Sequence, residues 1–227
     1  MKQTSFGLAL FAVVVAFGLG FVLARSYYAR PAGTEHRTAR QFVLYFTLSR
    51  VENPIIVLGD SIVEASSLPS GACGHPIINA GLSGASTASD LGGWLVPALA
   101  NKRPFAIIVA LGTNDALAPR PVTKQAFETS YASLLRELSK VTTHLFVLDI
   151  PAVEARERMT PEMQRQVMAT IREFRSVLPE LAARNNATFL PLPEMTPPFT
   201  VDGVHLNAEG YRAWDTAISR GTARACG

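Results

Sequence analysis

The 227-residue chain is predicted to be an α/β protein, a three-layer α/β/α sandwich built on a parallel sheet, for three reasons. Short apolar runs with strand character alternate with longer segments of helical periodicity, the order that places helices on both faces of a parallel sheet. Polar, glycine-containing blocks follow or flank three of these runs, and ligands of such sheets bind beyond the carboxyl ends of the strands. A hydrophobic content of 48% supports one sizeable core.

The apolar runs and helical patterns give the order of the elements. Strands are expected at Ile55–Leu58, Pro76–Asn79, Phe105–Leu111, Leu145–Ile150 and Thr188–Leu190. Helices are expected at Ser86–Asn101, Thr123–Lys140, Pro161–Arg184 and Asn207–Ser219. Pro179 predicts a kink or break within the third of these helices. One more helix, over Thr38–Val51, would connect this domain to the N-terminal part of the chain.

The N-terminal part is dominated by an uninterrupted apolar stretch of 19 residues, Phe6–Ala24. At about 1.5 Å per residue it matches the roughly 30 Å hydrocarbon thickness of a bilayer, which predicts a transmembrane helix. A cleaved signal peptide is the alternative, because Val22-Leu23-Ala24 is an acceptable cleavage site, but signal peptides usually carry only about 7–15 apolar residues. We therefore divide the chain into an anchor with its basic flank (1–30), a connecting helix (31–52) and a main domain (53–227).

Charge is unevenly distributed between these parts. Residues before Asn53 include 6 basic and 2 acidic side chains, whereas the rest of the chain has 15 and 16. The basic excess thus belongs to the segment beside the predicted anchor and suits anionic lipid headgroups. It gives no support for nucleic-acid binding by the main domain.

The most informative local pattern is an acid three residues before a histidine, in Asp202-Gly203-Val204-His205. The carboxylate can hold the ring Nδ1–H while Nε2 points outward, and an outward Nε2 is what a distant serine needs to become a nucleophile. Ser61, in Gly59-Asp60-Ser61, fits this requirement, because it follows the apolar run Ile55–Leu58 and lies where a buried strand ends.

Two further blocks, Asn79-Ala80-Gly81 and Gly112-Thr113-Asn114-Asp115, lie beside their own apolar runs. Each block alone reads as a turn or a helix cap. All four blocks together, in register with three strand-like runs, indicate one catalytic site. The sequence shows no His, Cys and carboxylate cluster with ligand spacing, so neither a metal nor another cofactor is predicted.

With these four blocks in this order, the chain resembles the SGNH (GDSL-type) hydrolases, a superfamily of esterases, lipases, thioesterases and carbohydrate deacetylases. The resemblance covers roughly Pro54 to Arg220 and implies a flavodoxin-like, five-stranded parallel sheet. One position departs from the pattern: many relatives have glycine four residues after the serine, and this chain has Ala65.

The resemblance assigns a role to each block. Ser61 is expected to be the nucleophile and His205 the general base, with Asp202 orienting the ring of His205. The backbone N–H groups of Ser61 and Gly81 and the side-chain amide of Asn114 are expected to form the oxyanion hole.

A second serine, Ser83, lies in Gly81-Leu82-Ser83-Gly84-Ala85, which is similar to the Gly-x-Ser-x-Gly nucleophile elbow. Its last position is alanine, and in folds with that elbow the triad acid lies on a different loop from the histidine. We therefore expect Ser83 to be a turn residue. The other histidines are interpreted as structural: His36, His75 and His144.

Together with the predicted anchor, the resemblance implies a membrane-anchored serine esterase that cleaves short-chain esters through an acyl-enzyme, and the hypothesis includes deacetylation of a carbohydrate. An O-acyltransferase with the same serine, a lysophospholipase or thioesterase, and a non-catalytic envelope-binding module are the alternatives. The loops Pro191–Val201 and Ala152–Thr160 are expected to be the two walls of a shallow substrate pocket. The expected partners are a small ester or acylated carbohydrate and the membrane.

The location of the main domain is inferred from opposing signals. The positive-inside rule, applied to the arginines after the apolar stretch, places the domain in the cytoplasm. The secretion-like N-terminus and the exported members of the resembled superfamily favour an extracytoplasmic domain, which is our prediction. In an oxidising compartment, Cys73 and Cys226, the only cysteines, would then form a disulfide.

Overall fold

The computed structural model describes residues 32–120, 122–155 and 159–226. The chain divides into two compact units, Met1–Ala39 and Arg40–Gly227, and helix α2 (Ala32–Ser49) begins in the first and ends in the second. The anchor expected within residues 1–30 lies outside the described residues. Among the helices that are described, none is both long enough and apolar enough to cross a membrane.

The second unit contains one sheet of six strands in the order β2-β3-β1-β4-β5-β6. The strands are β1 (Ile55–Gly59), β2 (Gly71–Ala72), β3 (His75–Gly81), β4 (Ala106–Ala110), β5 (His144–Leu148) and β6 (Thr188–Leu190). The five expected strands are present and pair in parallel, which confirms the α/β fold.

The expected number of five strands is wrong, because β2 adds a short antiparallel strand at the edge, beside β3. The two residues between β2 and β3, Cys73 and Gly74, both have positive φ angles, as in the tight turns that favour β-hairpins. A strand of two residues has no apolar run of its own, and cysteine is an unusual residue at such a turn. The sequence pattern therefore contained no signal for β2.

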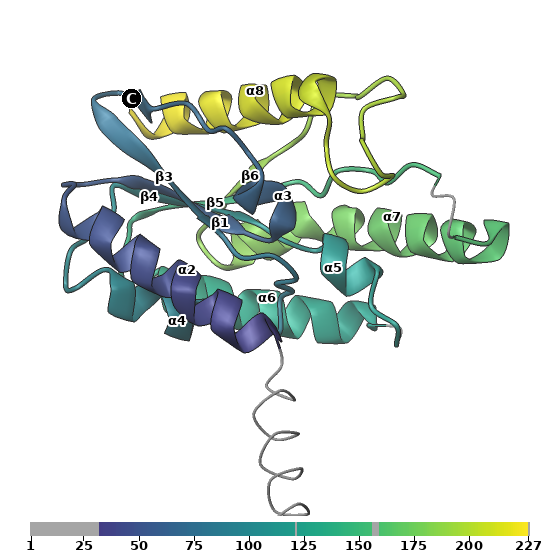
Figure 1. Cartoon of the computed structure of the whole chain (residues 1–227), viewed down its shortest axis with the longest axis horizontal. Coiled ribbons are helices and arrows are strands. Elements are labelled where there is room, and N and C mark those ends of the chain that lie inside the picture. Colours follow the sequence, from purple (N-terminus) through teal and green to yellow (C-terminus); the bar gives the residue numbers. More distant parts are fainter. Residues whose placement is uncertain (1–31, 121, 156–158, 227) are drawn as a thin grey trace, which may run out of the picture. The chain divides into compact units, whose positions relative to one another are not determined.

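Helices cover both faces of the sheet (Figure 1). Besides α2 they are α3 (Ser61–Glu64), α4 (Leu91–Ala98), α5 (Thr113–Ala116), α6 (Lys124–Leu138), α7 (Pro161–Arg184) and α8 (Ala208–Ala225). α7 continues past Pro179, so the predicted break is not present. α4 is shorter than expected, since its N-cap Asp90 has a left-handed backbone conformation and residues 86–90 form a loop.

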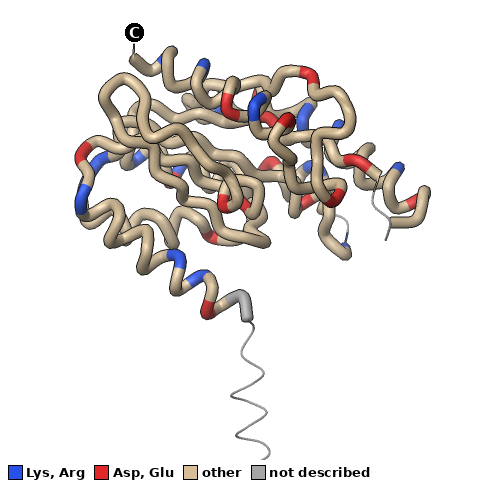
Figure 2. Tube along the Cα trace, turned by 45° about the horizontal axis from the view of Figure 1, so that its top comes forward, with Lys and Arg blue, Asp and Glu red and all other residues tan. Residues whose placement is uncertain are grey.

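Alternating side chains of β1 explain the three layers. Ile56 and Leu58 belong to a core with the buried faces of α4, α6 and α7, whereas Ile55 and Val57 belong to a second core with α8. All four side chains have no exposed surface, as expected for a central strand that is buried on both faces. Outside these cores, acidic and basic residues are interspersed along the described chain (Figure 2).

The register of the parallel strands places the predicted blocks side by side. Gly59 at the end of β1 pairs with Gly81 of β3 on one side and with Ala110 of β4 on the other. The segments that follow these three residues therefore leave the sheet at the same edge. A Cβ atom on Gly59 would lie 2.3 Å from the carbonyl oxygen of Ala110, so only glycine fits at this point.

Candidate active site

Ser61 is the first residue of α3, directly beyond the end of β1. The N-cap residue Asp60 accepts a hydrogen bond from the Ile62 N–H at 2.9 Å, which fixes the start of this short helix. The hydroxyl of Ser61 is half-buried at the carboxyl edge of the sheet. Ala65, where relatives carry glycine, caps α3 in an ordinary helical conformation, and its N–H donates to the Ser61 carbonyl.

The structure brings the hydroxyl of Ser61, the ring of His205 and the carboxylate of Asp202 into one hydrogen-bonded line. The Nε2 atom of His205 lies 2.9 Å from Oγ of Ser61, and its Nδ1 atom lies 2.8 Å from Oδ2 of Asp202. Serine and histidine are 144 positions apart in the sequence. The outward-facing Nε2 that the sequence pattern predicted is therefore directed at Ser61.

Asp202 is held as an anion by its own loop. Its Oδ1 atom accepts hydrogen bonds from the N–H groups of Val204 and His205, at 3.0 and 2.8 Å. Desolvation alone would raise the pKa of Asp202, but the hydrogen bonds from the backbone and ring of His205 and from Val204 outweigh it and lower the pKa to about 2. At neutral pH the carboxylate is charged and can accept the Nδ1–H of His205.

Asn114 lies in α5, just beyond the end of β4. Its Nδ2 atom donates to the Ala85 carbonyl at 2.8 Å, which uses one amide hydrogen and leaves the other available. The next residue, Asp115, accepts hydrogen bonds from the hydroxyl of Thr87 at 2.6 Å and from the Thr87 N–H. These contacts tie α5 to the loop after β3, the strand that ends with the Asn79-Ala80-Gly81 block.

The N–H of Gly81, an expected oxyanion donor, has a hydrogen-bond partner within its own block. This N–H donates to Oδ1 of Asn79 at 2.9 Å, and a Cβ atom at this position would overlap the backbone of α3 at Glu64. The N–H is thus engaged within its own block, and the absence of a side chain serves the close packing of β3 against α3. This contact counts against Gly81 as an oxyanion donor.

Gly84 is a candidate donor that the sequence analysis missed. The preceding Ser83 donates through both its N–H and its hydroxyl to Glu64 of α3, at 2.6 and 2.7 Å, which holds this loop close to the helix that starts with Ser61. Gly84 has a φ of +77°, and within the described chain its N–H makes no hydrogen bond. From the sequence alone, Gly84 could not be distinguished from an ordinary loop glycine, because its φ angle and its unpaired N–H appear only in the fold.

Ser83 itself has a carboxylate rather than a histidine as its partner, in agreement with its interpretation as a turn residue. Two other predicted structural histidines have backbone partners. Nδ1 of His75 lies 2.9 Å from the Asn53 carbonyl, and Nδ1 of His144 lies 3.0 Å from the Phe105 carbonyl. In the described part of the chain, no group of three or more His, Cys, Asp and Glu side chains could hold a metal ion.

Buried carboxylates lie beneath the site. Burial raises the pKa of Asp60 to about 7, against the opposing hydrogen bond from Ile62. Burial also raises the pKa of Asp115, although its hydrogen bonds with Thr87 oppose the shift. Asp149, at the end of β5, is instead charge-compensated by Arg175, whose guanidinium binds both of its oxygens at 3.1 and 2.7 Å. Burial thus penalises the ionisation of Asp60 and Asp115.

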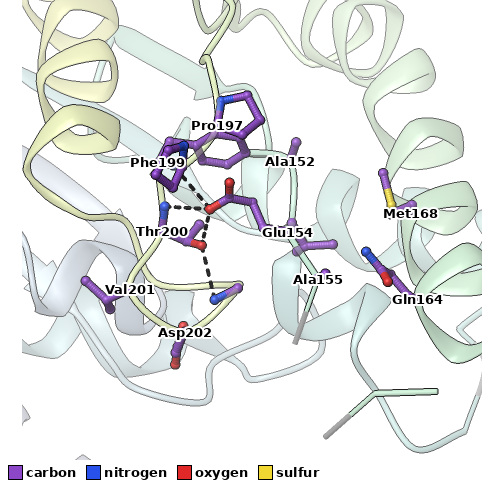
Figure 3. A pocket seen from close by; sticks show the side chains of 13 residues that line it. Ala152, Glu154, Ala155, Gln164, Met168, Pro197, Phe199, Thr200, Val201 and Asp202 are labelled. Atoms are coloured by element: carbon purple, nitrogen blue, oxygen red, sulfur yellow. Dashed lines mark hydrogen bonds between the residues drawn. The ribbon is translucent and has the colours of Figure 1, made fainter. Parts of the chain in front are cut away.

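Two cavities are lined in part by candidate site residues. One of about 1070 Å³ lies between residues 152–155 and 197–203, with Gln164 and Met168 of α7 completing its wall (Figure 3). These are parts of the two loops that the sequence analysis expected as walls. The other, of about 630 Å³, is lined by Gly84, Asn114 and residues of the loop and helix that follow α5. The first cavity borders Asp202 and the second borders Asn114.

A parallel sheet with serine, histidine and aspartate in line at its carboxyl edge is suited to ester hydrolysis. A model of the GDSL-like lipase/acylhydrolase family matches residues 57–213, and the chain belongs to this family of ester hydrolases. The match covers the predicted blocks from Ser61 to His205 and agrees with the resemblance seen in the sequence. None of the curated proteins compared with the chain matches it.

Solved structures with the same fold include three enzymes of related description. The lipase/acylhydrolase from Enterococcus faecalis is 22% identical, with a TM-score of 0.60 over 76% of this chain and 96% of that protein. A GDSL-like lipase from Bacteroides thetaiotaomicron is 18% identical, with a TM-score of 0.61 over 82% and 98%. A catalytic mutant of Axe2, an acetylxylan esterase from Geobacillus stearothermophilus, is 16% identical, with a TM-score of 0.56 over 75% and 94%. At these identities the likeness establishes the fold.

Proposed function

We propose that this ester hydrolase works through Ser61, His205 and Asp202 and an acyl-enzyme intermediate. The observation that supports the proposal most is the line of two hydrogen bonds, 2.9 and 2.8 Å long, from Ser61 through His205 to Asp202. Serine is a weak nucleophile until a base removes its proton during attack, and an imidazole that titrates near neutrality can do so. The charged carboxylate of Asp202 stabilises the imidazolium that results.

The reaction has two steps. Oγ of Ser61 attacks the ester carbonyl as its proton passes to Nε2 of His205, and the tetrahedral oxyanion collapses with loss of the alcohol, which takes that proton. Water then attacks the acyl-serine with the same base assistance and releases the acid. We assign oxyanion stabilisation to the Ser61 N–H and the remaining amide hydrogen of Asn114, with the Gly84 N–H favoured over that of Gly81 as the third donor. One such donor contributes about 3–4 kcal/mol to lowering the barrier.

We propose short-chain esters, including acetyl groups on carbohydrates, as the substrate class. The cavities beside Asp202 and Asn114 are open to solvent rather than enclosed, which favours small acyl groups. One structural neighbour is described as an acetylxylan esterase, which adds support for an acetylated sugar as substrate. A nitrophenyl ester series from acetate to palmitate tests this class, and a maximum at long chains would favour a lysophospholipase or thioesterase.

We also propose that the chain is anchored to a membrane with its main domain outside the cytoplasm. The apolar stretch Phe6–Ala24 supports an anchor, and a disulfide between Cys73 and Cys226 supports an oxidising compartment. The exposed side chains Phe42, Tyr45 and Phe46 of α2 add support, since aromatic residues are enriched at membrane interfaces. Protease accessibility of the domain in intact cells and spheroplasts would test its side of the membrane.

The nucleophile is tested by Ser61→Ala with Ser83→Ala as its matched control. We expect Ser61→Ala to abolish both hydrolysis of nitrophenyl acetate and labelling by a fluorophosphonate. The melting temperature should be nearly unchanged, because the residue is only half-buried and, among the described residues, its hydroxyl is hydrogen-bonded to His205 alone. Ser83→Ala should remain labelled and active. Persistent labelling of Ser61→Ala would reject the proposed nucleophile.

A further inference from the structure

Glu154, in the segment after β5, binds the loop that carries Asp202 and His205 (Figure 3). Its Oε2 atom accepts hydrogen bonds from the Phe199 N–H at 3.2 Å, from the Thr200 N–H at 2.7 Å and from the Thr200 hydroxyl. Its own backbone N–H donates to the Gly203 carbonyl at 2.8 Å. One residue therefore holds the loop at both its start and its middle.

Thr200 extends this contact toward the catalytic acid. Its hydroxyl donates to Glu154 and accepts a hydrogen bond from the Gly203 N–H at 3.1 Å, so both functions of the oxygen are used. Gly203 directly follows Asp202 and has a φ of +90°, which turns the chain back toward His205. A continuous set of hydrogen bonds thus runs from Glu154 through Thr200 to the turn that presents Asp202.

The strength of these bonds follows from the charge and burial of the partners. Three donors converge on one carboxylate oxygen, and hydrogen bonds to an ionised acceptor are roughly twice as strong as neutral ones. Phe199 at the start of the loop is 4% exposed and packs in the core shared with α8, so the loop is fixed there as well. Val204 and Leu206 are also buried in the cores, whereas Val201, between Thr200 and Asp202, is 71% exposed. Glu154 and Thr200 therefore add polar contacts to the part of the loop, around Val201 and Asp202, that the cores do not hold.

We propose that Glu154 and Thr200 are positioning residues that hold the Asp202–His205 loop in register with Ser61. This inference rests on the proposed function of the Ser61, His205 and Asp202 line. Glu154 makes no contact with Ser61 or with the ring of His205 among the hydrogen bonds of the described chain, so it acts through the loop rather than on the reacting atoms.

The expected consequence is a loss of turnover without a loss of substrate affinity. A displacement of the base by about 1 Å can lower a rate by about a hundredfold, because the proton transfer needs hydrogen-bond distance. A small ester such as nitrophenyl acetate is expected to rely little on the cavity that Glu154 and Thr200 line. We therefore expect kcat to fall by about ten- to a hundredfold when the link is broken, with KM changed by less than about threefold.

The test uses the full chain in detergent and compares Thr200→Val, which removes the hydroxyl at nearly constant shape, with Thr200→Ser, which keeps it. Thr170→Val is the matched control, because the Thr170 hydroxyl donates only to Gln166 within α7. Glu154→Ala and the Glu154→Ala/Thr200→Val double variant complete a double-mutant cycle. For each protein, kcat and KM for nitrophenyl acetate, the fluorophosphonate labelling rate and the melting temperature are measured.

We expect low kcat and slow labelling for Thr200→Val and Glu154→Ala. Thr200→Ser and Thr170→Val should keep a near-normal kcat. The double variant should have a kcat about equal to that of the slower single variant. Unchanged kcat in Thr200→Val with a lower melting temperature would overturn it, since the bonds would then serve stability only. A raised KM with normal kcat would also overturn it and assign Glu154 to substrate binding. Ser61→Ala is measured in parallel. If Ser61→Ala stays active, the proposed function is rejected. If Ser61→Ala is inactive and Thr200→Val is fully active, only the positioning role is rejected.

Discussion

At the scale of single residues, Asn114 combines two tasks in one amide group. One hydrogen of Nδ2 is committed to the Ala85 carbonyl, and this bond directs the second hydrogen. A donor that is oriented before the reaction can meet the developing oxyanion without reorganisation. The structural contact and the proposed catalytic role are thus linked in the same side chain, and a suitable control has to separate them.

Asn114→Ala is expected to lower kcat by about 10²–10³ with little change in KM, because the donor interacts most strongly with the charge of the transition state. Thr87→Val is the control. This change removes the 2.6 Å hydrogen bond from the Thr87 hydroxyl to Asp115. That bond also joins the loop after β3 to α5, but it does not involve the side-chain amide of Asn114. Steady-state kinetics on nitrophenyl acetate would measure kcat and KM for both variants. Near-normal kcat in Asn114→Ala with a lower melting temperature, or equal losses in both variants, would reject the oxyanion role.

Burial of the Asp60 carboxyl group, next to Ser61 in the sequence, is expected to lower the stability of the fold at high pH. Its pKa is raised by desolvation to about 7, so the folded state keeps the proton over a range in which the unfolded chain has lost it. A carboxyl with a raised folded pKa makes stability fall as pH rises, from its ordinary pKa of about 4 up to about 7. The destabilisation of the folded state by Asp60 is complete above that pH range and absent below it.

Asp60→Asn should therefore be at least as stable as the wild type at pH 8, and its melting temperature should vary less between pH 4 and 7. Asparagine keeps an oxygen that can accept the Ile62 N–H, and it carries no charge to desolvate. Melting curves at several pH values measure this, with Asp90→Asn as a control at an exposed helix cap. A steeper loss of stability at high pH in Asp60→Asn would contradict the assigned cause.

At the scale of elements, α2 contributes directly to the site rather than only joining the domain to the N-terminus. Arg40 donates to the Gly81 carbonyl through Nε and Nη2, at 3.1 and 3.0 Å, and its Nε lies 3.6 Å from a carboxylate oxygen of Glu64. Glu64 in turn holds Ser83. Leu44 and Leu48 of the same helix are buried in the core. The compact unit begins at Arg40, and the division at residue 53 made from the sequence remains a prediction.

Arg40→Gln is expected to lower kcat severalfold and the free energy of unfolding by about 1–3 kcal/mol, because hydrogen bonds to a charged group that is partly buried are lost. Arg50→Gln, at the exposed end of α2, is the control. Urea unfolding and kinetics on the full chain measure both effects. If Arg40→Gln and Arg50→Gln changed kcat and the free energy of unfolding equally, α2 would be a connector without influence on the loop after β3.

At the scale of the whole molecule, the disulfide joins parts of the chain that are 153 positions apart. Cys73 lies in the turn of the β2–β3 hairpin and Cys226 follows the last helix, so the bond ties α8 to the edge of the sheet. A cross-link over such a separation restricts the unfolded chain strongly. The chain-entropy model gives about 5 kcal/mol, as an upper value.

Replacing both cysteines by serine should lower the free energy of unfolding by about 2–5 kcal/mol while leaving kcat nearly unchanged, because the bond lies at the sheet edge away from Ser61. Urea unfolding of the wild type with and without reductant should reproduce the difference. Two alkylatable thiols in the native protein isolated without reductant would contradict the disulfide and remove its support for an extracytoplasmic domain.

Much of the site could be predicted from sequence because its chemistry is local. The acid and the histidine lie three residues apart, and the Ser61, Asn79 and Asn114 blocks each follow or end a strand-like run. In a parallel sheet the carboxyl ends of adjacent strands share one edge, so the order of the blocks was enough to bring them together. The edge strand β2 escaped prediction because two residues carry no periodic pattern.

The sequence by itself thus determined the family, the five parallel strands and the meeting of Ser61, His205 and Asp202, since these depend on local pattern and strand order. Only the tertiary structure decided how these residues are held. It assigned the Gly81 N–H to Asn79, linked Arg40 to the carbonyl of Gly81, and placed Glu154 against Thr200. Such contacts depend on side-chain direction and on packing between segments far apart in the chain, and no short-range pattern encodes either.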